Sequence, residues 1–505
     1  MCFWAASAKN LCEIEQNRGD KRGKQQMGFG LFKKDRTADT VFTNGNIYTQ
    51  NRELPWAEAV ACRDGKFIYV GNSQEVERYI GPDTYTVDLS GKYVLPGLIN
   101  THNHAALRIF EGMYIPVSQT EDLEGVLGVM SDYIFDNPEQ EAYFGYGFEE
   151  DIVKEMTQKE ASEKLDAVST EKPILLLNSG EDVLWVNNCA LEQARAAAQQ
   201  DGILKMSVSY FMQAVAPFNE EDLQNRVKEL ASEYSSKGFT SIFNVGAPEF
   251  MNNVYQEILL TMYQQETMKQ RYFGSLELAG NKVGRLQEAM KKLIQKRTHT
   301  TELDDFIHCN ILKLTLGQED VCEEPIAERL QTLLMEASER GFDVHVDALD
   351  HEAFIASMEY ITAIRNAGYR KNNFIIACDK EFRKKSEGFN LNDMSMENVF
   401  FQPSTRWEPA NEYAAVEEAK SIEEVLDCFT VDAAESLGIE NKLGSIEIGK
   451  LADFAVFEKN PFGLVNPMLF KRLLADMTVI AGQVVYDAEE ENMQEWYNLM
   501  SGIQL

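Results

Sequence analysis

The chain has 505 residues, of which 44% are hydrophobic and 26% are charged, and its formal net charge at pH 7 is −33. This length exceeds what one hydrophobic core normally serves, so at least two domains are expected. The acidic excess argues against a nucleic acid or an anionic membrane as the main partner. No apolar run reaches the roughly 18 residues that would predict a membrane-spanning helix.

The N-terminal segment and the cysteines indicate the cellular compartment of the protein. Residues 1–37 begin with a short apolar stretch but lack the basic region of a signal peptide, so we expect a poorly ordered tail, with Met27 as an alternative start. The eight cysteines form no C-x-x-C pair and show no disulfide-like spacing. Together these features favour a reducing, cytoplasmic location.

Short strand-like segments occur at both ends of the chain. Near the N-terminus, β-forming residues alternate and are punctuated by Asn-Gly and Asp-Gly turns, which is typical of hairpins. The segments are 41–43, 47–48, 57–61, 67–71 and 85–88, and a similar pattern returns at 444–446, 449–457, 477–480 and 484–487. Because chain termini often lie close together, we predict one small β-sandwich domain formed by residues 38–95 and 437–490, followed by a C-terminal extension over 491–505.

Between these ends, buried strands alternate with amphipathic helices. The predicted strands are 174–177, 241–245, 311–316, 343–346 and 374–377. One helix is expected over 325–340, since Pro325 suits a first helical turn and Gly341 a C-terminal cap. Repeated βα units over this length favour an α/β fold with a (β/α)8 TIM barrel across residues 96–436, and an open parallel sheet is the alternative.

The most specific motif is an apolar strand that ends in His102-Asn103-His104. Residues two apart on a strand point to the same face, so both imidazoles would converge on one point, as metal ligands do. The alternative is two unrelated histidines at a strand end. Lys313, between Ile311 and Thr315 on one strand face, is a second candidate, because a lysine inside a barrel needs a partner, a ligand or a modification unless its amine reaches water.

These motifs resemble the amidohydrolase superfamily, and more closely its family-three branch of N-acyl amino acid and N-substituted formamide hydrolases. The resemblance spans about residues 39–487 and includes the segments 144–148, 184–191, 238–241 and 444–454. It implies a barrel with a β-sandwich built from both chain ends, and a site that holds zinc or another divalent metal, as one or two ions. By this resemblance His102, His104 and His345 are metal ligands, and Lys313 carries a carbamate that bridges two metals.

The sequence also departs from that family pattern. Residues 179–183 lack the family's substrate-contacting histidine, so Glu181 or Asp182 takes its place, and Trp185 follows as a further substrate-binding candidate. The strand before Cys378 and Asp379 contains no histidine, and no aspartate stands in the family's eighth-strand context. With the usual base missing, the candidates for a general base are Asp347, Asp379 and Asp182.

We therefore expect a metal-dependent hydrolase that cleaves a C–N bond in a small amide, formamide or cyclic amide through a metal-activated water. The alternative is a catalytically impaired relative that binds a ligand or a partner protein. A homo-oligomer fits either reading.

Overall fold

The computed structural model describes most of the chain, namely residues 37–118, 120–179, 183–201, 208–247, 249–279, 286–301, 303, 305–385, 397–403 and 419–493. The chain forms two compact units. The first unit comprises residues 1–35, 110–225 and 248–260, and the second comprises 36–109, 226–247 and 261–505. Glu181 and Asp182 lie outside the described residues.

A seven-stranded sheet dominates the second unit. Its strands, in spatial order, are β18 (Val399–Pro403), β17 (Phe374–Cys378), β16 (Asp343–Ala348), β15 (Ile307–Leu316), β14 (Arg271–Ala279), β13 (Phe239–Asn244) and β8 (Leu98–Asn103). Every neighbouring pair in this sheet is parallel. Parallel strands linked through helices form a TIM-like barrel, so the coarse fold prediction is confirmed.

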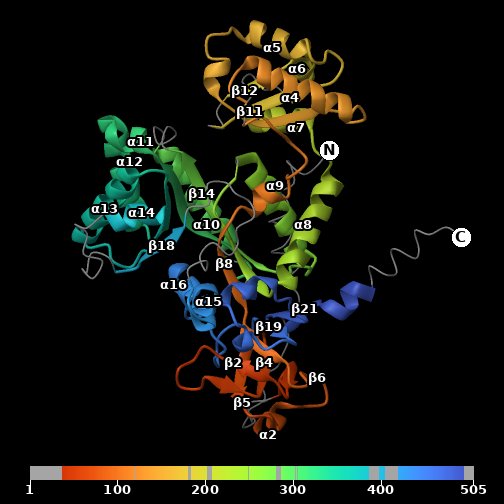
Figure 1. The fold of residues 1–505 in the computed structure, drawn as a ribbon, viewed down its shortest axis with the longest axis vertical. Helices are drawn as coiled ribbons and strands as arrows, with labels where there is room; N and C mark the ends of the chain where they lie inside the picture. Colours follow the sequence, from red (N-terminus) through yellow and green to blue (C-terminus); the bar gives the residue numbers. More distant parts are fainter. Residues whose placement is uncertain are drawn as a thin grey trace, which may run out of the picture. The chain divides into compact units, whose positions relative to one another are not determined.

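Helices connect these parallel strands. They are α10 (Leu286–Thr300), α11 (Gln318–Cys322), α12 (Glu324–Glu339), α13 (His351–Asn366) and α14 (Lys380–Lys385), and α15 (Ile422–Phe429) and α16 (Val431–Ser436) come later in the chain. In Figure 1, α11 to α14 lie together beside the strands labelled β14 and β18. The helix predicted over 325–340 is α12, one residue displaced at each end.

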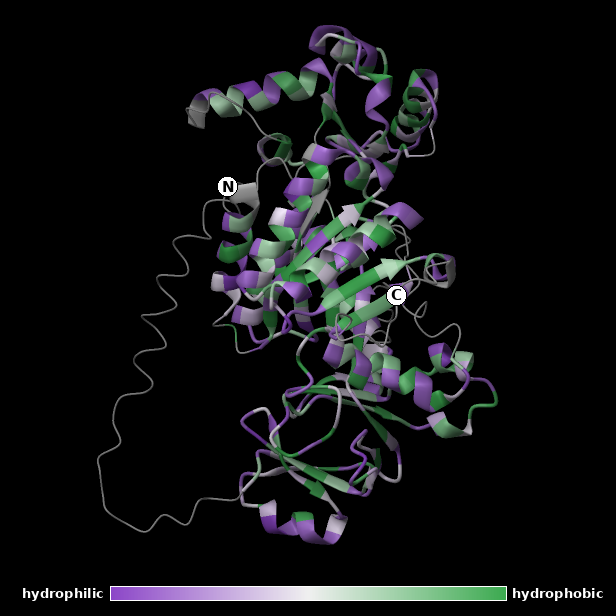
Figure 2. Ribbon diagram, turned by 90° about the vertical axis from the view of Figure 1, so that its left-hand side faces the viewer, coloured by the Kyte–Doolittle hydropathy of each residue, from purple (hydrophilic) through white to green (hydrophobic). Residues whose placement is uncertain are grey.

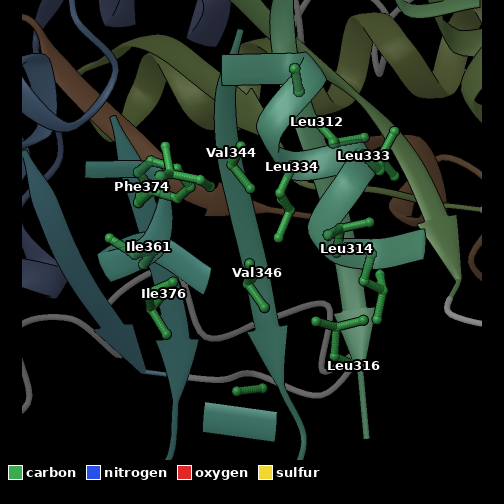
Figure 3. Close-up of a cluster of buried hydrophobic side chains, with 14 of the residues drawn as sticks. Leu312, Leu314, Leu316, Leu333, Leu334, Val344, Val346, Ile361, Phe374 and Ile376 are labelled. Carbon is green, nitrogen blue, oxygen red and sulfur yellow. The ribbon is translucent and has the colours of Figure 1, made fainter. Parts of the chain in front are cut away.

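Side chains on the two faces of β15 pack in different hydrophobic clusters. Leu312, Leu314 and Leu316 of β15 belong to a hydrophobic cluster with residues of α12 and α13. Figure 3 shows these leucines on the side of Leu333 and Leu334, with Ile361 beside Phe374 and Ile376. Ile311, on the opposite face of β15, packs in a separate cluster with residues of β8, β13, β14 and β17. Because side chains alternate along a strand, Lys313 shares the face of Ile311 and points away from the helices.

The second unit has two further sheets, and one of them combines strands from both chain ends. One sheet runs β5 (Lys66–Gly71), β4 (Ala59–Arg63), β1 (Thr40–Thr43), β6 (Tyr85–Asp88). The other runs β21 (Gln483–Asp487), β20 (Met477–Ile480), β19 (Phe454–Phe457), β7 (Tyr93–Pro96), β2 (Asn46–Tyr48), β3 (Trp56–Ala57). The C-terminal β19 pairs antiparallel with the N-terminal β7. The rings of Phe42 and Phe454 meet edge to face across one core, with centroids 4.8 Å apart.

The first unit has a four-stranded sheet of its own. Its strands are β12 (Leu184–Val186), β11 (Ile174–Asn178), β10 (Tyr143–Phe148) and β9 (Ile115–Pro116). Its helices are α4 (Leu123–Asp136), α5 (Gln158–Asp166), α6 (Asn188–Asp201) and α7 (Val208–Val215), while α8 (Glu220–Ser236) and α9 (Glu249–Gln264) begin here and end in the second unit. The first unit also contains the short helix η2 (Glu150–Ile152), and the short helices of the second unit are α2 (Ser73–Val76), α3 (Ala105–Arg108), η1 (Glu77–Tyr79), η6 (Pro461–Gly463) and η7 (Pro467–Arg472).

Hydrophobic residues concentrate in the strands, whereas the helices alternate between hydrophobic and hydrophilic residues (Figure 2). This pattern is that of sheets covered by amphipathic helices. Among the described helices, none has the length and apolar character that crossing a membrane requires.

A buried ion pair ties β14 to the segment before β19. Arg271 donates from Nε and Nη2 to the two carboxylate oxygens of Asp453, at 2.6 and 2.9 Å, and both side chains are buried. Replacing Arg271 by methionine would leave a buried carboxylate without its cation, so we expect the free energy of unfolding to fall by about 3–5 kcal/mol.

Urea unfolding measures this effect. The matched control is Lys442→Met, which breaks the half-exposed pair with Asp305 and should change stability by less than about 1 kcal/mol. Equal losses in the two variants would contradict the role assigned to the buried pair.

Candidate metal centre

The histidine motif lies at the carboxyl end of the first barrel strand. His102 is near the end of β8, and His104 directly follows β8 and precedes α3. Their ring centroids are 5.6 Å apart. Nδ1 of His104 lies 2.8 Å from the carbonyl oxygen of Gly246, and because a carbonyl only accepts, this nitrogen carries the proton. The geometry therefore leaves the lone pair of the His104 imidazole on Nε2.

The third predicted histidine joins them. His345 lies on β16, is fully buried, and has its ring centroid 5.5 Å from that of His102. Three buried ring nitrogens have no hydrogen-bond partner among the described residues. They are Nδ1 and Nε2 of His345 and Nε2 of His102. Buried polar atoms are nearly always paired in folded proteins, so these nitrogens point to a ligand.

Lys313 and Asp347 complete the cluster. Lys313 is the register partner of His345 on the neighbouring strand, and Asp347 lies two residues beyond His345, on the same strand face. Lys313 Nζ donates to Asp347 Oδ2 at 2.6 Å, and the pair is almost completely buried. Within the described part of the chain, the other carboxylate oxygen, Oδ1, has no hydrogen-bond partner.

Burial sets the charges of this cluster. Desolvation lowers the pKa of His102, lowers that of His104 to about 3, and lowers that of His345 far below its usual range. All three imidazoles are therefore neutral at pH 7, which is the form that coordinates a metal ion. Burial acts to raise the pKa of Asp347, but the charge and hydrogen bond of Lys313, together with His102 and His345, hold that pKa below its ordinary value.

These residues fit a divalent cation by their chemistry. Neutral imidazoles and a carboxylate are the donors that zinc and related ions take, and partnerless buried nitrogens are present. Among the described residues, however, no group of three or more His, Cys, Asp or Glu side chains is already arranged around one point. Asp347 Oδ2 accepts instead from Lys313 Nζ.

Gln402 was not identified from the sequence as a site residue. It lies on β18, and its Oε1 is 3.4 Å from Nδ1 of His102. An amide oxygen at this place favours the proton on Nδ1, so the lone pair of His102 also falls on Nε2. The sequence signal was the Gln402-Pro403 pair at the end of a strand-like segment.

Two other predicted residues have structural roles. Asp379 is exposed, and its Oδ1 accepts from the backbone N–H of Glu381 at 2.8 Å at the start of α14. Trp185 is buried in the core of the first unit, where its Nε1 donates to the carbonyl of Ala161 at 2.7 Å. Cys378 packs in the hydrophobic cluster of α12 and α13, on the strand face away from Lys313.

Comparisons with known proteins identify the family of the chain. Residues 85–377 and 396–486 match the model of the amidohydrolase family. The exoenzymes regulatory protein AepA of Pectobacterium carotovorum is 25% identical over 421 residues, which cover 75% of this chain and 87% of that protein. The N-substituted formamide deformylase of Arthrobacter pascens is 28% identical over 156 residues, 30% of this chain and 29% of the relative.

Among solved structures, an uncharacterised metal-dependent hydrolase from Pyrococcus horikoshii aligns with a TM-score of 0.52 at 16% identity. The alignment covers 84% of this chain and 98% of that protein. At this identity the likeness establishes the shared fold.

Proposed function

Because the chain belongs to the amidohydrolase family, we propose that it is a metal-dependent hydrolase that cleaves the C–N bond of a small amide, formamide or cyclic amide. The observation that carries the proposal is the buried convergence of His102, His345 and the Lys313–Asp347 pair on one face of the barrel sheet. The formamide deformylase among the relatives supports the choice of bond.

We assign the metal ligands to His102, His104, His345 and Lys313, and zinc or another divalent ion, as one or two ions, to the site. A divalent metal bound there would polarise the substrate carbonyl and lower the pKa of a coordinated water to about 7. Carboxylation of Lys313 would turn its cation into an anionic oxygen ligand and would release Asp347 from the ion pair, since the two groups would then repel each other.

Asp347 is the general base that we propose. Its Oδ1 is buried on the same strand face as His345 and accepts no hydrogen bond from the described residues. It is thus able to take a proton from the attacking water and return it to the leaving nitrogen. Asp379 is instead engaged as a helix cap, and Asp182, like the substrate-binding candidate Glu181, lies outside the described residues.

Three features of the prediction enter this proposal as well. The first is an eighth barrel strand within residues 96–436. The second is a composite β-sandwich from 38–95 and 437–490, flanked by segments 1–37 and 491–505. The third is a cytoplasmic protein that acts on a small molecule and forms a homo-oligomer. The core shared by the N-terminal sheet and the sheet built from both chain ends supports the second feature.

The test is turnover of a panel of N-substituted formamides, N-acyl amino acids and lactams by protein supplied with zinc. We expect release of amine or acid from at least one class, and loss of that release after chelation and recovery on adding metal back. Metal-replete, folded protein that turns over none of the panel would contradict the proposal.

One observation favours a second function, a catalytically impaired protein that binds a ligand or a partner. The inward positions of β17 are Ile375 and Ala377, and β18 carries no aspartate, so neither strand adds a ligand or a base. The relative AepA is named as a regulatory protein. This function predicts no turnover together with a ligand or protein that stays bound through purification.

A further inference from the structure

We propose that Tyr234 is a positioning residue for the candidate metal centre, acting through Asn103, the residue between His102 and His104. The inference rests on the proposed function, since it assumes that these two histidines bind a metal. Tyr234 lies on α8, far from the motif in sequence, and hydrogen-bonds to the side chain of Asn103.

Asn103 is held from two sides. Its side-chain Oδ1 accepts from the hydroxyl of Tyr234 at 2.8 Å, and its backbone carbonyl accepts from the N–H of Val245 at 2.8 Å. Both Asn103 and Tyr234 are almost completely buried. Since Asn103 is joined by peptide bonds to both histidines, a shift of its backbone would move both imidazoles.

The hydroxyl of Tyr234 is itself fixed in direction. Arg108 Nη1 donates to this oxygen at 3.2 Å, so the single hydroxyl proton is left for Asn103. Arg108 Nη2 in turn donates to Glu233 at 2.9 Å, and Lys237 binds the other oxygen of Glu233 at 2.9 Å. The phenol therefore cannot turn away without breaking a charge-assisted bond.

This hydrogen-bond network also includes the helix that follows the histidine motif. Arg108 ends α3, the short helix that starts directly after His104, and the Arg108 N–H donates to the His104 carbonyl at 3.0 Å. Tyr234 thus connects the residue before His104 with the helix after it. Bonds that orient metal ligands from outside typically change metal affinity about 10–100-fold when they are removed.

The decisive variant is Tyr234→Phe, which removes the hydroxyl and keeps the ring. Zinc affinity is measured by competition with a chromophoric chelator, and ligand geometry by the visible spectrum of the cobalt-substituted protein. We expect zinc affinity to fall about 10–100-fold and the cobalt spectrum to change. Asn103→Leu removes the acceptor of the same bond, so it should weaken zinc binding alike, and the double variant no further than either single one.

Tyr69→Phe is the matched control. Tyr69 is also buried, and its hydroxyl donates to the carbonyl of Asn72 at 3.1 Å, at β5 rather than beside the histidines. The control should lower the melting temperature about as much as Tyr234→Phe but leave zinc affinity and the cobalt spectrum unchanged. Equal weakening by both variants, or wild-type affinity in Tyr234→Phe, would overturn the inference.

His102→Ala separates this inference from the function beneath it. If His102→Ala abolishes zinc binding while Tyr234→Phe binds as the wild type does, the positioning role is wrong and the metal centre stands. If His102→Ala binds zinc as tightly as the wild type, the metal centre is wrong, and the positioning role is refuted with it.

Discussion

The double variant His102→Ala/His104→Ala is expected to lose both metal binding and hydrolysis. The two imidazoles are neutral at pH 7 because burial lowers their pKa values, and they are the pair that one strand end directs to one place. Removing two ligands should exceed the roughly 10–100-fold loss of affinity that an outer-shell change produces. Metal content after gel filtration and turnover of the best panel substrate are the two readouts.

A control histidine makes this result specific. His299 lies exposed near the end of α10, so His299→Ala should keep the full metal content and activity. Wild-type metal content in the double variant would show that the ion, if present, is held elsewhere.

Asp347→Asn should lower kcat by about 10²–10⁴-fold, the usual contribution of a general base. The amide keeps the size of the carboxylate but cannot accept a proton at neutral pH. The same change leaves the buried Lys313 ammonium without its anion, which costs about 3–5 kcal/mol of stability when a buried pair is broken. The activity must therefore be measured where circular dichroism shows the variant to be folded.

The matched control is Asp379→Asn, the other described aspartate that the sequence offered as a base. Asparagine caps helices about as well as aspartate, so stability and activity should stay near the wild-type values. A large loss of activity in Asp379→Asn, with Asp347→Asn active, would exchange their roles.

The acid limit of stability follows from the same pair. The folded pKa of Asp347 lies below its ordinary value, so the folded state binds fewer protons there than the unfolded state. The contribution of the ionised Asp347 to the free energy of unfolding is therefore complete above the unfolded pKa of about 3.9. It is lost as the pH falls below that value.

Much of the barrel was predictable because its signal is local. Leu312, Leu314 and Leu316 recur at every second position of β15, as strand residues of one face do. The run over Phe374–Cys378 is continuously apolar, which is typical of a strand buried on both faces. The resemblance to amidohydrolases, carried by short motifs, is confirmed by the family match. β14 was missed because Arg271, Gly274 and Ser275 break its apolar pattern, and Arg271 is buried only through its contact with Asp453.

The contacts that make the site could not be read from the sequence, because they join distant segments. The residues near Lys313 in the sequence do not indicate that Asp347, 34 positions later, is its ion-pair partner. Gln402 reaches His102 across 300 positions, and Tyr234 reaches Asn103 across 131. Trp185, which the motif made a substrate-binding candidate, lies in the hydrophobic core of the first unit.

The metal content of unsupplemented, purified protein tests the central claim most directly. If His102, His104, His345 and Lys313 form a metal centre, elemental analysis will find one or two equivalents of zinc or another divalent ion, and the His102→Ala/His104→Ala variant will have lost them. A folded wild-type protein that contains no metal, and takes up none when zinc is added, would contradict it.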